Sequence, residues 1–202
     1  MYQTKAELVL ASGSPRRREL LSRLGLEFRV IPSELREDMS LAGSPVAAAQ
    51  EWARRKAAAV AEKLGREEKV WCLAVDTIVV VAREVLGKPG SREEARSFLE
   101  KLSGRWHEVI SAYCIFNSGA RTMVQNQVSS QVKIAALAAE EIAAYLDTEE
   151  PYDKAGAYAA QGIGAFMVEE IQGSYTNVVG LPLTELVSDL KKLGIIAVKA
   201  QG

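Results

Sequence analysis

The chain of 202 residues contains one histidine, His107, and two cysteines, Cys72 and Cys114. A single histidine excludes a zinc site built on several histidines and the metalloprotease helix that carries two of them. The cysteines lie in separate apolar runs and form no CxxC pair, which predicts reduced core thiols rather than a redox or metal centre. His107 stands near the start of a predicted strand, where a structural role is favoured and catalysis is the alternative.

The chain also lacks an excess of charge and a long apolar run. Its 25 Lys and Arg residues oppose 26 Asp and Glu residues, for a net charge of −1. No global field attracts nucleic acid or a membrane, so we expect neither partner and expect any anion binding to be local. No apolar stretch approaches the roughly 18 residues of a membrane span, and the first apolar run is too short for a signal peptide. These features predict a cytoplasmic protein.

The apolar pattern predicts an α/β fold. With 48% apolar and 25% charged residues, the composition is that of an ordinary globular protein with its own core. Predicted strands cover 8–11, 28–31, 70–82, 106–116, 122–134 and 166–171. Predicted helices cover 14–24, 44–64, 91–103, 140–146 and 182–193. Strands that alternate with helices, together with one antiparallel hairpin, predict a mixed sheet.

A turn of sequence SGSP joins the first predicted strand to the first predicted helix. Ser14 suits the cap of this helix, and Pro15 suits its first position. Backbone N–H groups and the helix dipole direct positive charge at such a turn, where Arg16 and Arg17 add two guanidinium groups. Because cations at a helix N-terminus oppose its dipole, two adjacent ones suggest that a phosphate offsets them. A solvated basic face that follows an ordinary cap is the alternative.

Asp76 and Thr77 interrupt the most hydrophobic segment of the chain. Burying a carboxylate there costs several kcal/mol unless a cation or hydrogen bonds compensate it. At a strand end that faces a cleft, Asp76 is suited to hold Mg²⁺ or to activate water. The alternative is a turn residue between two short strands.

Five blocks follow one another between Leu8 and about residue 193: LVLASGSPRRRELLSRLG, AVDTIVVVAREVLGKP, KLSGRWHEVISA, EEPYDKAGAYAAQGIGAFMVEEIQGSY and NVVGLPLTEL. They resemble the Maf family of nucleoside triphosphate pyrophosphatases. The resemblance implies one domain over residues 1–202, with a mixed β-sheet flanked by helices and two lobes around a central cleft, as in Maf and ITPase-like proteins. It also implies a divalent metal cation (Mg²⁺, Mn²⁺ or Co²⁺) and cleavage of the substrate to a monophosphate and pyrophosphate. A homodimer is compatible with it.

The resemblance assigns roles to residues that are unremarkable when taken singly. Asp76 matches the proposed catalytic base, and Glu37 would share the metal. Whether Asp76 is the base or a metal ligand stays open, because one carboxylate can do either. The implied phosphate-binding residues are Ser12, Ser14, Arg16, Arg17, Lys56, Lys88 and Lys154, with Asp153 beside the last. Five cations and a metal ion would match the roughly four negative charges of a triphosphate.

Arg16, Thr77 and Gln161 match the three positions at which branches of the family differ, so they are the predicted specificity residues. The amide of Gln161 offers a donor and an acceptor, which complement the O4 and N3–H groups of uracil and thymine. We therefore predict a dTTP and UTP pyrophosphatase that cleans the nucleotide pool and turns over CTP at least about tenfold less well. The alternatives are a nucleotide-binding regulator of septum formation, which the family's older name suggests, and a pyrophosphatase for purine or modified nucleotides.

Overall fold

The computed structural model describes residues 1–35, 43–65, 70–117, 119–120 and 122–200. The chain divides into two compact units, and each is described by itself below. Unit 1 comprises residues 1–76, 112–127 and 180–202, and unit 2 comprises residues 77–111 and 128–179. The predicted mixed α/β fold is confirmed. The single domain and the central cleft stay predictions.

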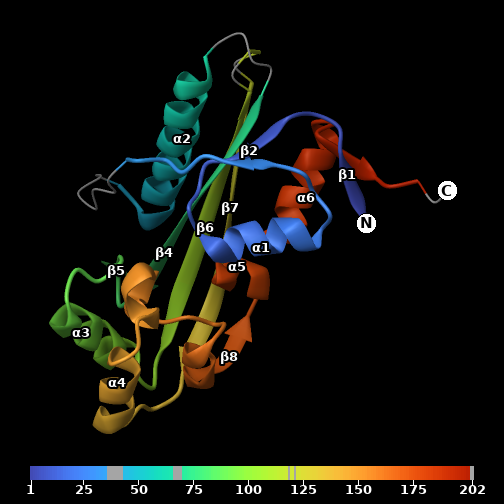
Figure 1. The fold of residues 1–202 in the computed structure, drawn as a ribbon. Coiled ribbons are helices and arrows are strands. Elements are labelled where there is room, and N and C mark those ends of the chain that lie inside the picture. The colour runs from blue at the N-terminus through green and yellow to red at the C-terminus, as the bar shows by residue number, and fades with distance from the viewer. Residues whose placement is uncertain (36–42, 66–69, 118, 121, 201–202) are drawn as a thin grey trace. The chain divides into compact units, whose positions relative to one another are not determined.

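Unit 1 is built on a mixed sheet with the strand order β3-β2-β4-β6-β7 (Figure 1). Its strands are β2 (Leu8–Leu10), β3 (Arg29–Val30) and the unit 1 parts of β4 (Trp71–Val81), β6 (Trp106–Asn117) and β7 (Met123–Ile134). β2 is parallel to both β3 and β4, with Leu10 opposite Leu73. A separate antiparallel pair, β1 (Tyr2–Thr4) with β9 (Ile196–Val198), joins the two ends of the chain.

The helices of unit 1 are α1 (Pro15–Arg23), α2 (Pro45–Leu64) and α6 (Leu183–Lys192). α2 begins as its sequence predicts, because the Ser44 side chain accepts the N–H of Ala47 and Pro45 takes the first position. Ser14 is the N-cap of α1 by position, although its side chain makes no capping hydrogen bond. One face of α2 is buried, and it includes Lys56 among small apolar residues.

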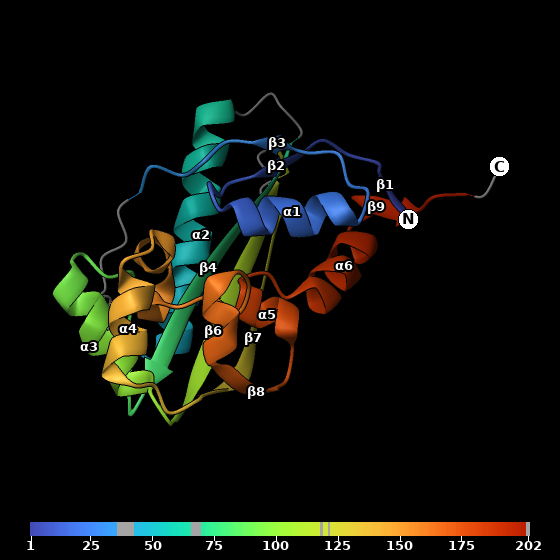
Figure 2. The same cartoon turned by 60° about the horizontal axis from the view of Figure 1, so that its bottom comes forward.

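Unit 2 continues β4, β6 and β7, with β5 (Glu84–Leu86) antiparallel to β4 and β8 (Val168–Gln172) antiparallel to β7. Its helices are α3 (Arg92–Leu102), α4 (Ala139–Leu146) and α5 (Tyr175–Val179), and three short 3₁₀ helices are η1 (Glu150–Asp153), η2 (Ala155–Ala157) and η3 (Ile163–Met167). α3 packs against α4, its neighbour in Figure 2, and also against η2.

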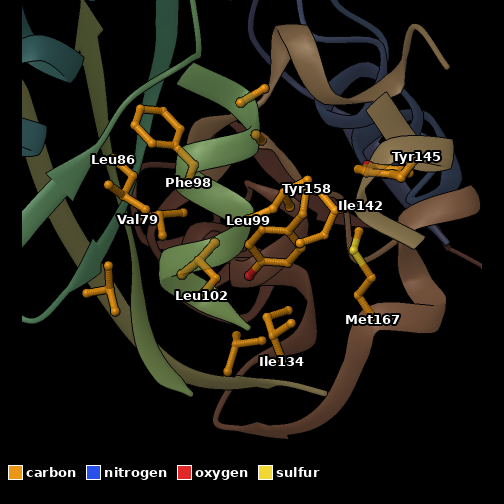
Figure 3. Close-up of a cluster of buried hydrophobic side chains, with 14 of the residues drawn as sticks. Val79, Leu86, Phe98, Leu99, Leu102, Ile134, Ile142, Tyr145, Tyr158 and Met167 are labelled. Atoms are coloured by element: carbon orange, nitrogen blue, oxygen red, sulfur yellow. The ribbon is translucent and has the colours of Figure 1, made fainter. Parts of the chain in front are cut away.

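The core of unit 2 is a cluster of apolar side chains from these elements (Figure 3). Leu99 and Leu102 of α3 lie beside Tyr158, which follows η2, whereas Phe98 lies on the side of Val79 and Leu86. The three α3 residues recur at the spacing of one helix face, which is the pattern that predicts this helix. The core therefore fixes the segment around η2, which carries several predicted site residues.

Most predicted elements are present, and the differences are informative. β4 runs unbroken from Trp71 to Val81, so the interpretation of Asp76 as a turn residue between two strands is wrong. The strand predicted over 28–31 is shortened to Arg29–Val30, and β1, β5, α5, β9 and the 3₁₀ helices were not predicted. Among the described residues, no helix is both long and apolar enough to cross a membrane.

Candidate active site

Asp76 lies within β4 of unit 1 and is only 3% exposed. Lys56 reaches it from the buried face of α2, where its Nζ donates to Asp76 Oδ1 at 2.6 Å. Lys56 itself is 8% exposed, although a lysine taken singly is usually a surface residue. The ammonium compensates the desolvation of the carboxylate, which explains how β4 carries an acid among apolar residues. A lysine at an apolar position of the helical repeat is the signal that could have identified it.

The SGSP turn leaves β2 next to the part of β4 that carries Asp76. Leu10 is paired with Leu73, and the N–H of Ala11 donates to the carbonyl of Leu73 at 2.7 Å. Because the two strands are parallel, the chain after β2 leads to Ser12 in the same direction in which β4 leads from Leu73 to Asp76. The turn that follows β2 therefore lies beside the middle of β4, where Asp76 stands.

Arg17 holds the SGSP turn in place. Its Nη1 donates to Ser12 Oγ at 2.9 Å, and its Nε donates to the carbonyl of Gly180 at 2.9 Å. Ser12 Oγ also accepts the N–H of Ser14 at 3.3 Å. Two N–H groups of Arg17 thus bind protein atoms, which gives this arginine a structural task that the sequence did not indicate.

Arg16 differs from its neighbour. Its side chain is half-buried, and its Nε is buried without a hydrogen-bond partner among the described residues. No acidic residue stands in the first turn of α1 to offset the positive charge. Buried N–H groups are almost always paired, and the N-terminus of a helix favours negative charge. Arg16 and the turn before it are therefore suited to an anion.

Two predicted phosphate-binding lysines belong to adjoining segments of unit 2. Lys88 is exposed after β5, and the N–H of Gly156 donates to the carbonyl of Gly87 at 3.0 Å. Lys154 donates through Nζ to the carbonyl of Glu150 at 2.6 Å and forms an ion pair with Asp153. Gly156 has a φ of +70°, and an added Cβ would lie 3.1 Å from the Val79 side chain. The close approach of Gly156 to β4 thus requires glycine.

The predicted specificity residues of unit 2 occupy different surroundings. Thr77 Oγ1 lies 2.8 Å from Ser111 Oγ, and the Ser111 hydroxyl donates to the carbonyl of Asn177 at 3.0 Å. Since Ser111 has one hydroxyl proton, Thr77 is the donor in the bond between them. Gln161 is half-buried in the turn between η2 and η3. Ser111 and Asn177 come from distant segments, so no local pattern identified them.

The remaining candidates from the sequence are core residues. His107 is 2% exposed and forms a 2.7 Å hydrogen bond through Nε2 to the Tyr158 hydroxyl. Burial lowers the pKa of His107 to about 4, so the ring is neutral at pH 7. Cys72 and Cys114 are free and buried, and burial raises the pKa of these thiols to about 11 and about 12. The prediction that both thiols lie in the core is confirmed.

The predicted metal ligands are only partly described. Glu37 lies outside the described residues, so its role stays a prediction. Within the described ranges, no group of three or more His, Cys, Asp or Glu residues is arranged to hold a metal ion. The other predicted ligand, Asp76, is described, and its carboxylate lies beside the ammonium group of Lys56.

The family model described as Maf-like protein matches residues 7–193. The dTTP/UTP pyrophosphatase of Thermococcus kodakarensis is 49% identical over 187 residues, covering 93% of this chain and 96% of the relative. The dTTP/UTP pyrophosphatase of Geobacter sulfurreducens is 47% identical over 192 residues, covering 95% and 99%. A solved nucleoside-triphosphatase, the dITP/XTP pyrophosphatase of Mycobacterium abscessus, matches with a TM-score of 0.44 and 16% identity over 93% of this chain and 95% of its own.

Proposed function

We propose, from the premise that the chain belongs to the Maf family, that it hydrolyses dTTP and UTP to the nucleoside monophosphate and pyrophosphate. The two relatives described above are named for this activity and align with 93% and 95% of the chain. The family match over residues 7–193 includes the SGSP turn, β4 and the segment that carries Gln161.

The buried pair of Asp76 and Lys56 is the observation that carries the proposal. Asp76 accepts a proton from water, whose oxygen attacks the α-phosphorus while the bond to the bridging oxygen breaks and pyrophosphate leaves. A carboxylate next to a triphosphate is repelled by it, and the Lys56 ammonium at 2.6 Å offsets that repulsion. An ammonium has three N–H donors, so pairing with Asp76 is compatible with the phosphate contact predicted for Lys56.

The SGSP turn is the proposed phosphate-binding segment of unit 1. The buried Nε of Arg16 is proposed to donate to a phosphate oxygen, since the described residues supply no partner for it. Arg17 is proposed to assist, because its guanidinium fixes the turn through Ser12 and Gly180 and so holds a positive charge beside it. Ser14 adds a hydroxyl that makes no capping bond to α1. Lys88 and Lys154 keep their phosphate-binding role as part of the proposal.

A divalent cation is also proposed. Mg²⁺ is typically bound through one or two carboxylates together with water and substrate phosphates, which Asp76 and, as the second candidate, Glu37 would satisfy. When bound, such an ion supplies neutralisation of the phosphate charge. Gln161 then selects the base by pairing with O4 and N3–H, and Arg16 and Thr77 are the other proposed specificity residues.

A pyrophosphate-release assay tests the function. The purified protein is mixed with Mg²⁺, Mn²⁺ or Co²⁺ and a panel of dTTP, UTP, CTP, purine triphosphates and 7-methylguanosine triphosphate. We expect dTTP and UTP to be preferred. Asp76→Asn should lower turnover by about 100-fold or more, because it removes the proton acceptor.

Asp147→Asn is the matched control, since Asp147 is an exposed carboxylate that pairs with Arg92 at the surface. Near wild-type turnover by Asp76→Asn would show that Asp76 is not the base. If none of the nucleotides releases pyrophosphate, the hypothesis of an enzyme is wrong, and the nucleotide-binding regulator becomes the favoured function. A preference for a purine or methylated nucleotide would overturn the substrate assignment.

A further inference from the structure

The carboxylate of Glu150 caps a helix that is distant from it in sequence. Glu150 begins η1, and its two carboxylate oxygens accept the N–H groups of Ile163 at 3.0 Å and Gly164 at 2.7 Å. These are the first two residues of η3, whose N–H groups have no acceptor within the helix. Gly162 precedes them as the N-cap and has no side chain that could accept their hydrogen bonds. Glu150 therefore replaces the missing cap.

Tyr145 completes this arrangement, because its hydroxyl donates to Glu150 Oε1 at 3.0 Å. The turn is packed so closely that only glycine fits at two positions. A Cβ added at Gly162, where φ is +79°, would collide with the Glu150 carboxylate. A Cβ at Gly164 would lie 2.7 Å from the Tyr145 hydroxyl oxygen. The backbone of the turn is therefore held directly against Glu150.

Gln161 is the residue immediately before this turn. We propose that Glu150 is a positioning residue for Gln161, so that its carboxylate, through the N–H groups of Ile163 and Gly164, determines how the amide is presented to the base. This inference rests on the proposed function, in which Gln161 selects pyrimidine triphosphates. A carboxylate suits the task because it is purely an acceptor, and hydrogen bonds to a charged acceptor are the stronger kind.

The same residue also contacts a predicted phosphate-binding group. The backbone carbonyl of Glu150 accepts a hydrogen bond from Lys154 Nζ at 2.6 Å. Glu150 thus contacts Lys154 through its main chain and the turn after Gln161 through its side chain. A substitution of the side chain leaves the carbonyl in place and so tests the turn separately from Lys154.

Glu150→Gln is the test variant, and Glu149→Gln is its matched control. In Glu150→Gln the side chain keeps its length, but one of the two acceptor oxygens becomes an NH₂ donor, which leaves an N–H of the turn without an acceptor. Glu149 is the exposed neighbour, so its substitution changes the net charge equally without affecting the turn. Hydrogen exchange of the peptide covering residues 160–167 and kcat/KM for dTTP and CTP are measured on the full chain.

We expect Glu150→Gln to accelerate exchange at Ile163 and Gly164 by about tenfold or more and to lower the dTTP-to-CTP ratio of kcat/KM by about fivefold or more. Glu149→Gln should change neither quantity. A purely structural role would reduce the fraction of active protein, which lowers kcat equally for both nucleotides and leaves the ratio unchanged. The ratio therefore distinguishes positioning from destabilisation.

Each outcome decides a separate claim. Unchanged exchange in Glu150→Gln would overturn the cap, and faster exchange with an unchanged ratio would overturn the positioning role. Should Glu150→Gln fail to fold, Tyr145→Phe removes one donor to the same carboxylate and should lower the ratio less strongly; an unchanged ratio there would also refute the role. If the wild type hydrolyses neither dTTP nor UTP, the proposed function fails and the positioning role fails with it, while the exchange result still establishes or refutes the cap.

Discussion

Lys56→Met removes the ammonium that lies against Asp76 and keeps most of the side-chain volume. Asp76 is 3% and Lys56 8% exposed, so water cannot readily replace the lost partner. Removing one member of a buried ion pair typically costs about 3–5 kcal/mol, because the other charge is left uncompensated. The free energy of unfolding of a typical domain is about 5–15 kcal/mol. We therefore expect Lys56→Met to fold but to lose a large part of its stability, together with most of its pyrophosphate release.

The double variant Lys56→Met/Asp76→Asn isolates the interaction. It removes both charges, so we expect it to be more stable than Lys56→Met by about 2 kcal/mol or more, which makes the two substitutions strongly non-additive. Urea unfolding of the wild type, both single variants and the double variant, followed by circular dichroism at pH 7, gives the coupling free energy. A cost below about 1 kcal/mol for Lys56→Met, or strict additivity in the double variant, would refute the view that Lys56 compensates a buried charge.

Three further predictions concern unit 2. Burial lowers the pKa of His107 from 6.5 to about 4, so the unfolded chain binds a proton before the folded chain does as the pH falls. The free energy of unfolding should therefore be unaffected by His107 above about pH 6.5 and should decrease by up to about 3 kcal/mol as the pH falls toward 4. In urea titrations at several pH values, His107→Gln should lose less stability over this interval than the wild type, and parallel curves would contradict the assignment. Gly156→Ala should lower the free energy of unfolding by about 1–3 kcal/mol, because Gly156 combines a positive φ with crowding. Gly65→Ala is the control and should cost less, since Gly65 has a similar φ of +78° but nothing within 4 Å. Equal shifts of the melting temperature in the two variants would show that crowding makes no contribution. Gln161→Glu should lower kcat/KM for dTTP and UTP by about tenfold, since it exchanges the N–H donor facing O4 for an acceptor, and an unchanged value would show that Gln161 does not pair with the base.

Local sequence patterns were sufficient for most of the secondary structure. The capping serine and first-turn proline of α2, and the apolar spacing of α3, predict helices that the structure contains. The short pair of β1 with β9 was missed, because three-residue strands at opposite ends of the chain carry no detectable period and are defined by their pairing. The alternative of a turn at Asp76 is wrong for a related reason. A carboxylate disrupts an apolar strand only when it lacks a cation, and its cation lies on a separate helix.

The sequence by itself determined which residues are available for the chemistry: the SGSP turn, Arg16, Asp76, the lysines and Gln161 were all identifiable from motif and family resemblance. Tertiary structure alone decided what each of them contacts. It paired Lys56 with Asp76, engaged Arg17 with Ser12 and Gly180, and placed the Glu150 carboxylate on the turn after Gln161. The physical reason is that each such contact joins side chains or backbone groups whose separation in sequence follows no helix or strand period, so the partner is chosen by how the segments pack.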